Sequence, residues 1–188
     1  MLKKERKTMI GLKRGYVELQ EYTDEWHKLY KIEEETLRNL IREYFIDIQH
    51  IGSTSVEGLK AKPIIDIIIG VRNFNDLEVI IEKLRHGGYI YRPNASTKER
   101  ILFVKGSEEE RTHHIHIVQW MDEEWNNNIL FRDYLRNHGE VTKEYSDLKD
   151  KLAEQFKEDR SSYTSGKDQF IQGVIERAKI ELQKHMET

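Results

Sequence analysis

Helical stripes and short apolar runs alternate along the first seventy residues. After Thr23 and Asp24, apolar side chains recur at helical spacing and predict a first helix, with the stripe Trp26, Leu29, Leu37, Leu40, Ile41 and Tyr44. Residues 44–52 are typical of a short strand, and residues 53–59 suit a single turn. The isoleucine-rich run 62–71 favours a strand buried on both faces.

The remaining residues predict a second helix, three short strands and a helical end. The second helix begins near Asn75 and ends at the glycines within 86–89, which suit a left-handed cap. Short strands are expected at 89–92, 100–104 and 113–118. Helical spacing then returns in the residues Trp125, Ile129, Leu130, Leu135, Val141, Tyr145, Leu148, Leu152, Phe156, Phe170, Val174, Ala178 and Leu182.

This order predicts an α+β fold with an α/β-like core and some parallel pairing across the crossover helix. We expect one domain over residues 1–188, with a basic N-terminal arm at 1–14 and a helical C-terminal part at about 123–186. The arm carries six lysine and arginine residues, and a solvated terminus is the favoured interpretation.

Composition restricts the functional classes. Of the 188 residues 35% are charged, and the net charge of -3 argues against a general nucleic-acid binder. No apolar run is long enough to span a bilayer, so a membrane partner is not expected. The chain has no cysteine, which excludes disulfides, thiol nucleophiles and thiolate metal sites and fits a cytoplasmic location.

The Gly52-Ser53 pair directly follows a predicted strand. A turn of this kind presents backbone N–H groups that bind anions, most often phosphate, although an ordinary turn is the alternative. Asp66 lies inside the next apolar run, after enough residues for the chain to return alongside. It would hold a divalent metal beside the phosphate, or it is a buried polar group with satisfied hydrogen bonds.

A second group of candidates lies on the predicted strand 113–118. His114 and His116 share one of its faces and His113 lies on the other. The pair is either a metal site or two hydrogen-bonded core imidazoles. Arg111 could clamp a phosphate, and His50 is a further candidate metal ligand.

Two further cations have alternative interpretations. Lys62 contacts a phosphate or is a surface lysine. Arg132 and Arg136 share a helix face and either close over a phosphate or carboxylate or form ion pairs, and the ion pair is favoured for Arg136.

The stretch HIGSTSVEGLKAKPIIDI resembles the signature of the GrpB family, a group of bacterial proteins placed in the nucleotidyltransferase superfamily. The segments GGYIYR, THHIHIV, LFRDYLRNHGE and YTSGKDQFI extend the resemblance over about residues 16–180. It implies a nucleotidyltransferase-like fold, with a small mixed β-sheet, flanking helices and a helical C-terminal part. In some relatives such a domain is fused to dephospho-coenzyme A kinase or to an acetyltransferase-like domain, which points to nucleotide or coenzyme metabolism.

By position, the resemblance assigns Gly52 and Ser53 to the phosphate-binding turn and Asp66 to the first metal carboxylate. Thr54, the next residue, is a further candidate for phosphate or nucleotide binding. His114 and His116 fall on the strand where the superfamily commonly supplies a third carboxylate. The second carboxylate of the pattern would fall at position 68, which is Ile68. Aspartate with histidine ligands suits Mn²⁺ or Zn²⁺ better than Mg²⁺.

Three functional hypotheses follow. The first is metal-dependent nucleotidyl transfer to an unknown acceptor, activated by the metal or by His114. Its ligand is a nucleotide or phosphorylated small molecule, and its cofactor is Mg²⁺, Mn²⁺ or Zn²⁺. The alternative is a non-catalytic nucleotide- or coenzyme-binding module, which Ile68 favours. A histidine-based metal hydrolase, the third, would need His50, Asp66, His114 and His116 to converge.

Overall fold

A computed structural model describes residues 10–13, 15–107 and 109–186 of the chain. The predicted basic arm therefore lies largely outside the described residues, since residues 1–9 and 14 are not among them. The strands are β1 (Leu12–Lys13), β2 (Asp47–Ile51), β3 (Ile65–Val71), β4 (Ile90–Tyr91), β5 (Arg100–Gly106) and β6 (Glu110–Gln119). The helices are α1 (Glu25–Leu40), α2 (Leu77–His86), α3 (Glu123–Asn137), α4 (Gly139–Gln155), α5 (Arg160–Ser165) and α6 (Asp168–Met186), with short 3₁₀ turns η1 (Ser53–Ser55) and η2 (Pro93–Ala95).

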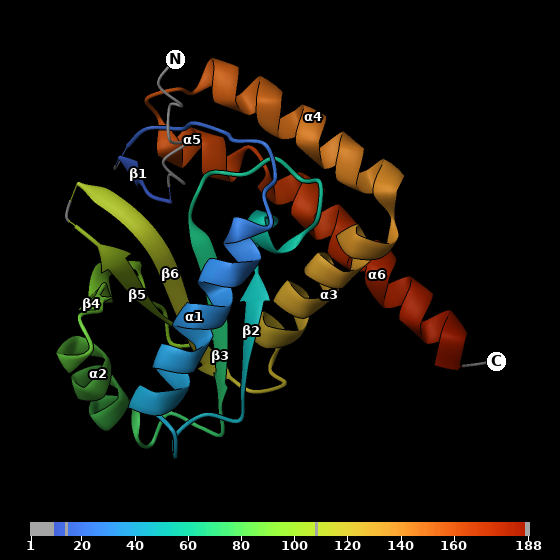
Figure 1. Cartoon of the computed structure of the whole chain (residues 1–188). Helices are drawn as coiled ribbons and strands as arrows, with labels where there is room; N and C mark the ends of the chain where they lie inside the picture. The colour runs from blue at the N-terminus through green and yellow to red at the C-terminus, as the bar shows by residue number, and fades with distance from the viewer. Residues whose placement is uncertain (1–9, 14, 108, 187–188) are drawn as a thin grey trace.

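The described strands form one mixed sheet in the order β2-β3-β6-β5-β4, and β1 pairs with β6 (Figure 1). β2 returns antiparallel beside β3, and β5 and β6 form an antiparallel hairpin. β3 and β6 are parallel, which confirms the pairing expected across the crossover that contains α2. The α+β fold class is confirmed.

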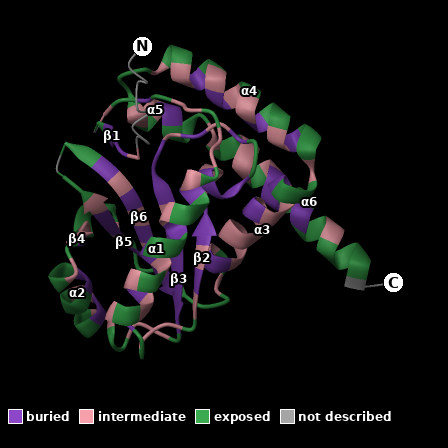
Figure 2. Ribbon diagram, viewed as in Figure 1, coloured by how far each residue is buried: buried purple, intermediate pink, exposed green. Residues whose placement is uncertain are grey.

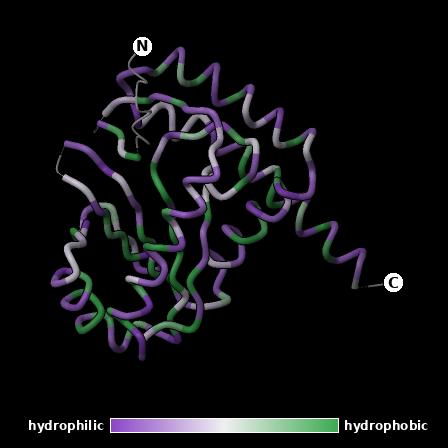
Figure 3. Tube along the Cα trace, viewed as in Figure 1, coloured by the Kyte–Doolittle hydropathy of each residue, from purple (hydrophilic) through white to green (hydrophobic). Residues whose placement is uncertain are grey.

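The first face of the sheet is covered by α1 and α2 (Figure 1). Ile65, Ile67 and Ile69 of β3 pack there against apolar residues of both helices, together with Ile115 of β6. These side chains are almost fully buried, and the central strands are the most buried and hydrophobic part of the ribbon (Figures 2 and 3). Burial of this apolar surface is the main stabilising contribution to the core.

The second face lies under the C-terminal helices. Trp125 of α3 packs on Ile51, Ile68 and Val118 from three neighbouring strands. A separate apolar cluster joins α3, α4 and α6 to the segment after β2 through Val56 and Leu59. The predicted helical C-terminal part thus lies against the Gly52-Ser53 turn. None of the described helices is long and apolar enough to cross a bilayer.

Candidate functional site

Strand register brings the central polar residues to one face. In the parallel pair β3–β6, Asp66 lies opposite His114, and Ile68 lies opposite His116. Side chains alternate between the faces of a strand, so these residues point away from the face that packs under α1. The prediction that His114 and His116 share a face therefore agrees with the register.

Asp66, His114 and His116 offer ligand atoms that all lie within 4.8 Å of one another. The Nδ1 atom of His114 is 2.9 Å from Oδ1 of Asp66, and Nε2 of His116 is 3.9 Å from the same oxygen. Burial alone would raise the pKa of Asp66, but hydrogen bonding by His114 and His116 lowers it well below its ordinary value. Asp66 is therefore an ionised carboxylate at neutral pH.

This donor set fits a divalent metal ion. A carboxylate oxygen and two imidazole nitrogens are hard and borderline ligands, a mixture that suits Mn²⁺ or Zn²⁺. A two-metal site needs several oxygen ligands to hold its paired ions, and this cluster has a single carboxylate. The described residues of this cluster therefore provide for one ion.

Gly52 brings the turn close to Asp66. Its φ of +69° and ψ of -175° lie in a region that is essentially restricted to glycine. A Cβ atom at this position would lie 2.6 Å from Oδ2 of Asp66. The adjacent pairing of Ile51 with Asp66 fixes this approach, so the turn and the carboxylate form one unit.

The turn and the carboxylate open into a cavity of about 410 Å³, a volume typical of small-molecule sites. β2, β3, β6, α3, α5 and α6 all contribute to its walls, as do the residues that follow β2. Its polar and charged lining includes Ser53, Thr54, Lys62, Asp66, His114, His116, Glu124, Asn127, Asn128, Arg160, Thr164, Lys167 and Gln172.

The cationic side chains of Lys62, Arg160 and Lys167 line this cavity. The ring centre of Tyr163 is 5.2 Å from Nζ of Lys62 and 4.6 Å from Nζ of Lys167. Lys149 lies behind the turn, where its Nζ donates to Oγ of Ser53 at 3.1 Å and to the carbonyl of Lys60. Arg160 of α5 places Nη2 3.2 Å from Nε2 of His114.

Burial and mutual repulsion shift the pKa values of these lysines. Burial, followed by the charges of Arg160 and Lys167, lowers the pKa of Lys62 to about 7. Burial, followed by the charge of Lys167, lowers the pKa of Lys149 to about 7 as well. Burial also lowers the pKa of Lys167, with Asp66 opposing the shift. The nearby anionic groups therefore do not balance the positive charges of Lys62, Lys149 and Lys167.

His50 is not brought to this group. It pairs with Ile67, so its side chain lies on the opposite face of the sheet from Asp66. Its ring stacks on Tyr30 with centres 4.6 Å apart, and its Nε2 lies 3.0 Å from Oγ1 of Thr54. Burial lowers the pKa of His50 to about 3, so the ring is neutral.

Arg111 is not brought to this group either. The β5–β6 register shifts between the pairs Lys105–His113 and Gly106–Arg111, which interrupts the alternation of faces along β6 at this point. Arg111 is buried and donates to the carbonyl of Ser107 at 2.9 Å. Arg111 is not one of the described residues that line the cavity.

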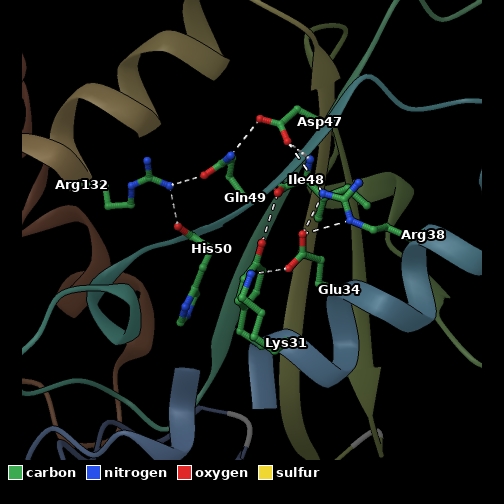
Figure 4. A network of polar contacts seen from close by, with 9 residues as sticks. Lys31, Glu34, Arg38, Asp47, Ile48, Gln49, His50 and Arg132 are labelled. Carbon is green, nitrogen blue, oxygen red and sulfur yellow. Dashed lines mark hydrogen bonds and ion pairs between the residues drawn. The ribbon is translucent and has the colours of Figure 1, made fainter. Parts of the chain in front are cut away.

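Arg132 links α3 to β2. Its Nη1 donates to Oε1 of Gln49 at 2.8 Å and to the carbonyl of His50 at 3.0 Å (Figure 4). Its Nε donates to Oδ1 of Asp133 at 2.7 Å. Nη2 of Arg136 donates to the carbonyl of Ser55 at 2.8 Å, and its Nη1 lies 3.6 Å from Oδ1 of Asp133. Arg132 does not line the cavity within the described part of the chain.

The sequence reasoning did not identify Lys149, Arg160 or Lys167 as site residues. One signal was present for Lys149, which follows Val141 and Tyr145 at helical spacing on the apolar face of α4. A lysine at such a position is rarely buried without a partner. Arg160 and Lys167 occur in polar segments with no comparable pattern.

Comparison with known proteins identifies similar chains. The GrpB protein family model matches residues 16–177. The glutamate-rich protein GrpB of Alkalihalophilus pseudofirmus is 37% identical, over 89% of this chain and 98% of the relative. The UPF0157 protein YqkA of Bacillus subtilis is also 37% identical, over 87% of this chain but only 47% of the relative.

Solved structures with a similar fold include a GrpB protein and a poly(U) polymerase. The crystal structure of the conserved protein GrpB from Enterococcus faecalis has a TM-score of 0.81 and 30% identity, over 88% of this chain and 99% of that one. The Cid1 poly(U) polymerase with Mg 3'-dATP bound has a TM-score of 0.54 and 15% identity, over 78% of this chain and 49% of that one. The second similarity shows a nucleotidyltransferase-like fold and nothing more.

Proposed function

The chain belongs to the GrpB family, and on that premise we propose that its cavity binds the phosphates of a nucleotide together with one divalent metal ion. One observation carries the proposal. Among the described residues, Lys62, Arg160 and Lys167 line the cavity together with Asp66 and the Gly52-Ser53 turn, and Lys149 supports the turn from behind through Ser53.

The electrostatic balance favours an anionic ligand. Burial and like charges lower the pKa values of Lys62 and Lys149 to about 7, so these groups are only partly protonated at neutral pH. A phosphate beside them would stabilise their charged forms, so binding should take up protons. The hydroxyl of Ser53, already an acceptor for Lys149, can donate to a phosphate oxygen.

The proposed metal ligands are Asp66, His116 and His114. A bound divalent ion would neutralise phosphate charge and polarise the transferring phosphoryl group. The chain's own contribution is to hold Asp66 ionised and to keep it against the turn through Gly52.

The reaction that suits this arrangement is nucleotidyl transfer. An acceptor oxygen would form a bond to the α-phosphorus as the bond to pyrophosphate breaks, and the acceptor proton would pass to a base. The lysine cluster would hold the leaving pyrophosphate, since charge develops there. The fold similarity to the Cid1 poly(U) polymerase supports this reaction class.

A second candidate function is nucleotide or coenzyme binding without transfer. Ile68 favours it, because this residue is fully buried beneath Trp125 where the nucleotidyltransferase pattern has a carboxylate. Phosphate binding needs only the lysines and the turn, whereas two-metal transfer needs ligands that the described cluster does not provide.

Calorimetric titration of the full chain with ATP or pyrophosphate, with and without Mn²⁺, tests the binding. We expect Lys62→Met and Lys167→Met, at two lysines that line the cavity, to weaken binding at least tenfold, whereas Lys151→Met, on the exposed side of α4, leaves it unchanged. Titration in buffers of different ionisation enthalpy should show proton uptake. Equal affinities in all three variants, or no binding by the wild type, would overturn the proposal.

Transfer is tested separately by pyrophosphate release from labelled nucleoside triphosphates over a panel of acceptors. Release that requires Mn²⁺ and is lost in Asp66→Asn supports nucleotidyl transfer. Binding without release over the whole panel supports the binding module.

A further inference from the structure

Both ring nitrogens of His114 are already engaged. Nδ1 lies 2.9 Å from Oδ1 of Asp66, and Nε2 lies 3.2 Å from Nη2 of Arg160. A guanidinium group can only donate, so Nε2 of His114 must be the acceptor in that contact. The proton of the neutral imidazole is therefore on Nδ1, from which it is donated to the ionised Asp66.

A metal ion at His114 is incompatible with this arrangement. An ion on Nε2 would occupy the place where Arg160 donates. An ion between Nδ1 and Asp66 would require Nδ1 to lose its proton, which leaves the neutral imidazole protonated at Nε2. That N–H would then face the N–H of Arg160, with two donors opposed and no acceptor between them. In either case Arg160 must leave His114.

The same contact restricts His114 as a base. The lone pair at Nε2 is occupied while Arg160 donates to it, so it cannot accept a proton from an acceptor hydroxyl. Removal of Arg160 is thus a condition for His114 to act either as a metal ligand or as a base.

Resting on the proposed function, we propose that Arg160 is a positioning residue that excludes the metal from His114 until a phosphate draws the guanidinium away. Arg160 lines the cavity together with Lys62 and Lys167. A bidentate phosphate contact is stronger than a donation to a neutral imidazole, so a phosphate in the cavity competes well for Arg160. Phosphate binding then releases His114 to complete the metal site.

This arrangement links the two binding events. Loss of Arg160 should strengthen metal binding in the absence of phosphate and weaken phosphate binding in the absence of metal. A general loss of structure would weaken both. The opposite signs are therefore the signature of a residue that alternates between the two partners.

Mn²⁺ titration of the full chain without phosphate provides the test. Arg160→Ala should bind Mn²⁺ roughly tenfold more tightly than the wild type. Lys167→Ala is the matched control, because it removes one positive charge that also acts on Asp66 but makes no contact with His114. An equal gain in Mn²⁺ affinity in both variants would mean that Arg160 acts only through its long-range charge, and would overturn the inference. Absence of Mn²⁺ binding by Arg160→Ala would overturn it as well.

The tautomer is observable directly by ¹⁵N NMR of the histidine side chains, with His114→Gln to assign the signal. The metal-free wild type should carry the His114 proton on Nδ1, and addition of pyrophosphate with Zn²⁺ should remove that form. A metal-free His114 protonated at Nε2 would overturn the inference.

The two proposals fail separately. Pyrophosphate binding without the excess metal affinity of Arg160→Ala overturns the role of Arg160 and leaves the proposed function intact. Absence of pyrophosphate binding overturns the proposed function and the phosphate-driven release. The metal titration then still decides whether Arg160 excludes the ion.

Discussion

Replacement of Gly52 by alanine should damage both the stability of the protein and the proposed metal site. The backbone at Gly52 has φ +69° and ψ -175°, where a non-glycine residue costs about 1–3 kcal/mol. The added Cβ would lie 2.6 Å from Oδ2 of Asp66, and overpacking of this kind costs about 1–3 kcal/mol more. We therefore expect Gly52→Ala to lower the free energy of unfolding by about 2–6 kcal/mol.

Gly58→Ala provides the matched control. Gly58 has a similar φ of +74°, but a Cβ atom there would meet no heavy atom within 4 Å. It should lose only about 1–2 kcal/mol, from the left-handed backbone alone. Urea unfolding followed by circular dichroism measures both variants, and Mn²⁺ titration of the folded proteins should show weaker binding only for Gly52→Ala.

A double-mutant cycle isolates the contact with Asp66. In an Asp66→Ala background the closest contact, with Oδ2, is removed while the Cβ contact at 3.1 Å remains, so Gly52→Ala should cost about 1–2 kcal/mol less than it does in the wild type. Additive effects of the two substitutions would refute the proposed steric contact. A cost of Gly52→Ala no greater than that of Gly58→Ala would also contradict the steric contribution.

Three other predictions follow from buried groups. The pKa of Lys149 is about 7 in the folded protein and 10.5 in the unfolded chain, so between these pH values only the unfolded chain holds the proton. The free energy of unfolding should therefore rise from pH 7 toward 10. Urea titrations at several pH values should show a smaller rise in Lys149→Met. Arg132→Met should cost about 3 kcal/mol, because it leaves Gln49 and a buried carbonyl without their donor, while pyrophosphate affinity measured by calorimetry stays unchanged. His116→Gln should weaken Mn²⁺ binding at least tenfold and His50→Gln should leave it unchanged; the reverse result would place the metal on the other face of the sheet.

Much of the fold could be predicted because strong periodicity governs it. The run 62–71 contains β3, and the helix expected after Asp24 is α1, which begins at Glu25. Strand β1 was not predicted, since two residues carry no recognisable pattern. β4 is likewise shorter than the expected 89–92, because the chain turns at Pro93 into η2.

The site was predictable where it depends on a single strand or turn. Alternation along one strand is enough to place His114 with His116, whereas the register shift beside Arg111 interrupts that alternation. His50 required more, because its face depends on the register between β2 and β3, which pairs Ile51 with Asp66. Lys149 and Arg160 come from helices distant in sequence, and only tertiary packing brings them to the turn.

The register of β3 and β6 also explains how the site differs from a three-carboxylate centre. Ile68 lies opposite His116, and Trp125 covers Ile68 on the same face. A carboxylate at position 68 would therefore be buried in an apolar cluster, where an unpaired charge is strongly destabilising. Ile68→Asp should consequently unfold the protein more readily rather than create a second metal site, since α3 excludes water from that position. The additional ligand that we propose lies one strand away, at His116, which lines the cavity. The isoleucine at position 68 and the imidazole at position 116 are thus two parts of one arrangement, which favours a single, nitrogen-ligated ion over paired Mg²⁺ ions.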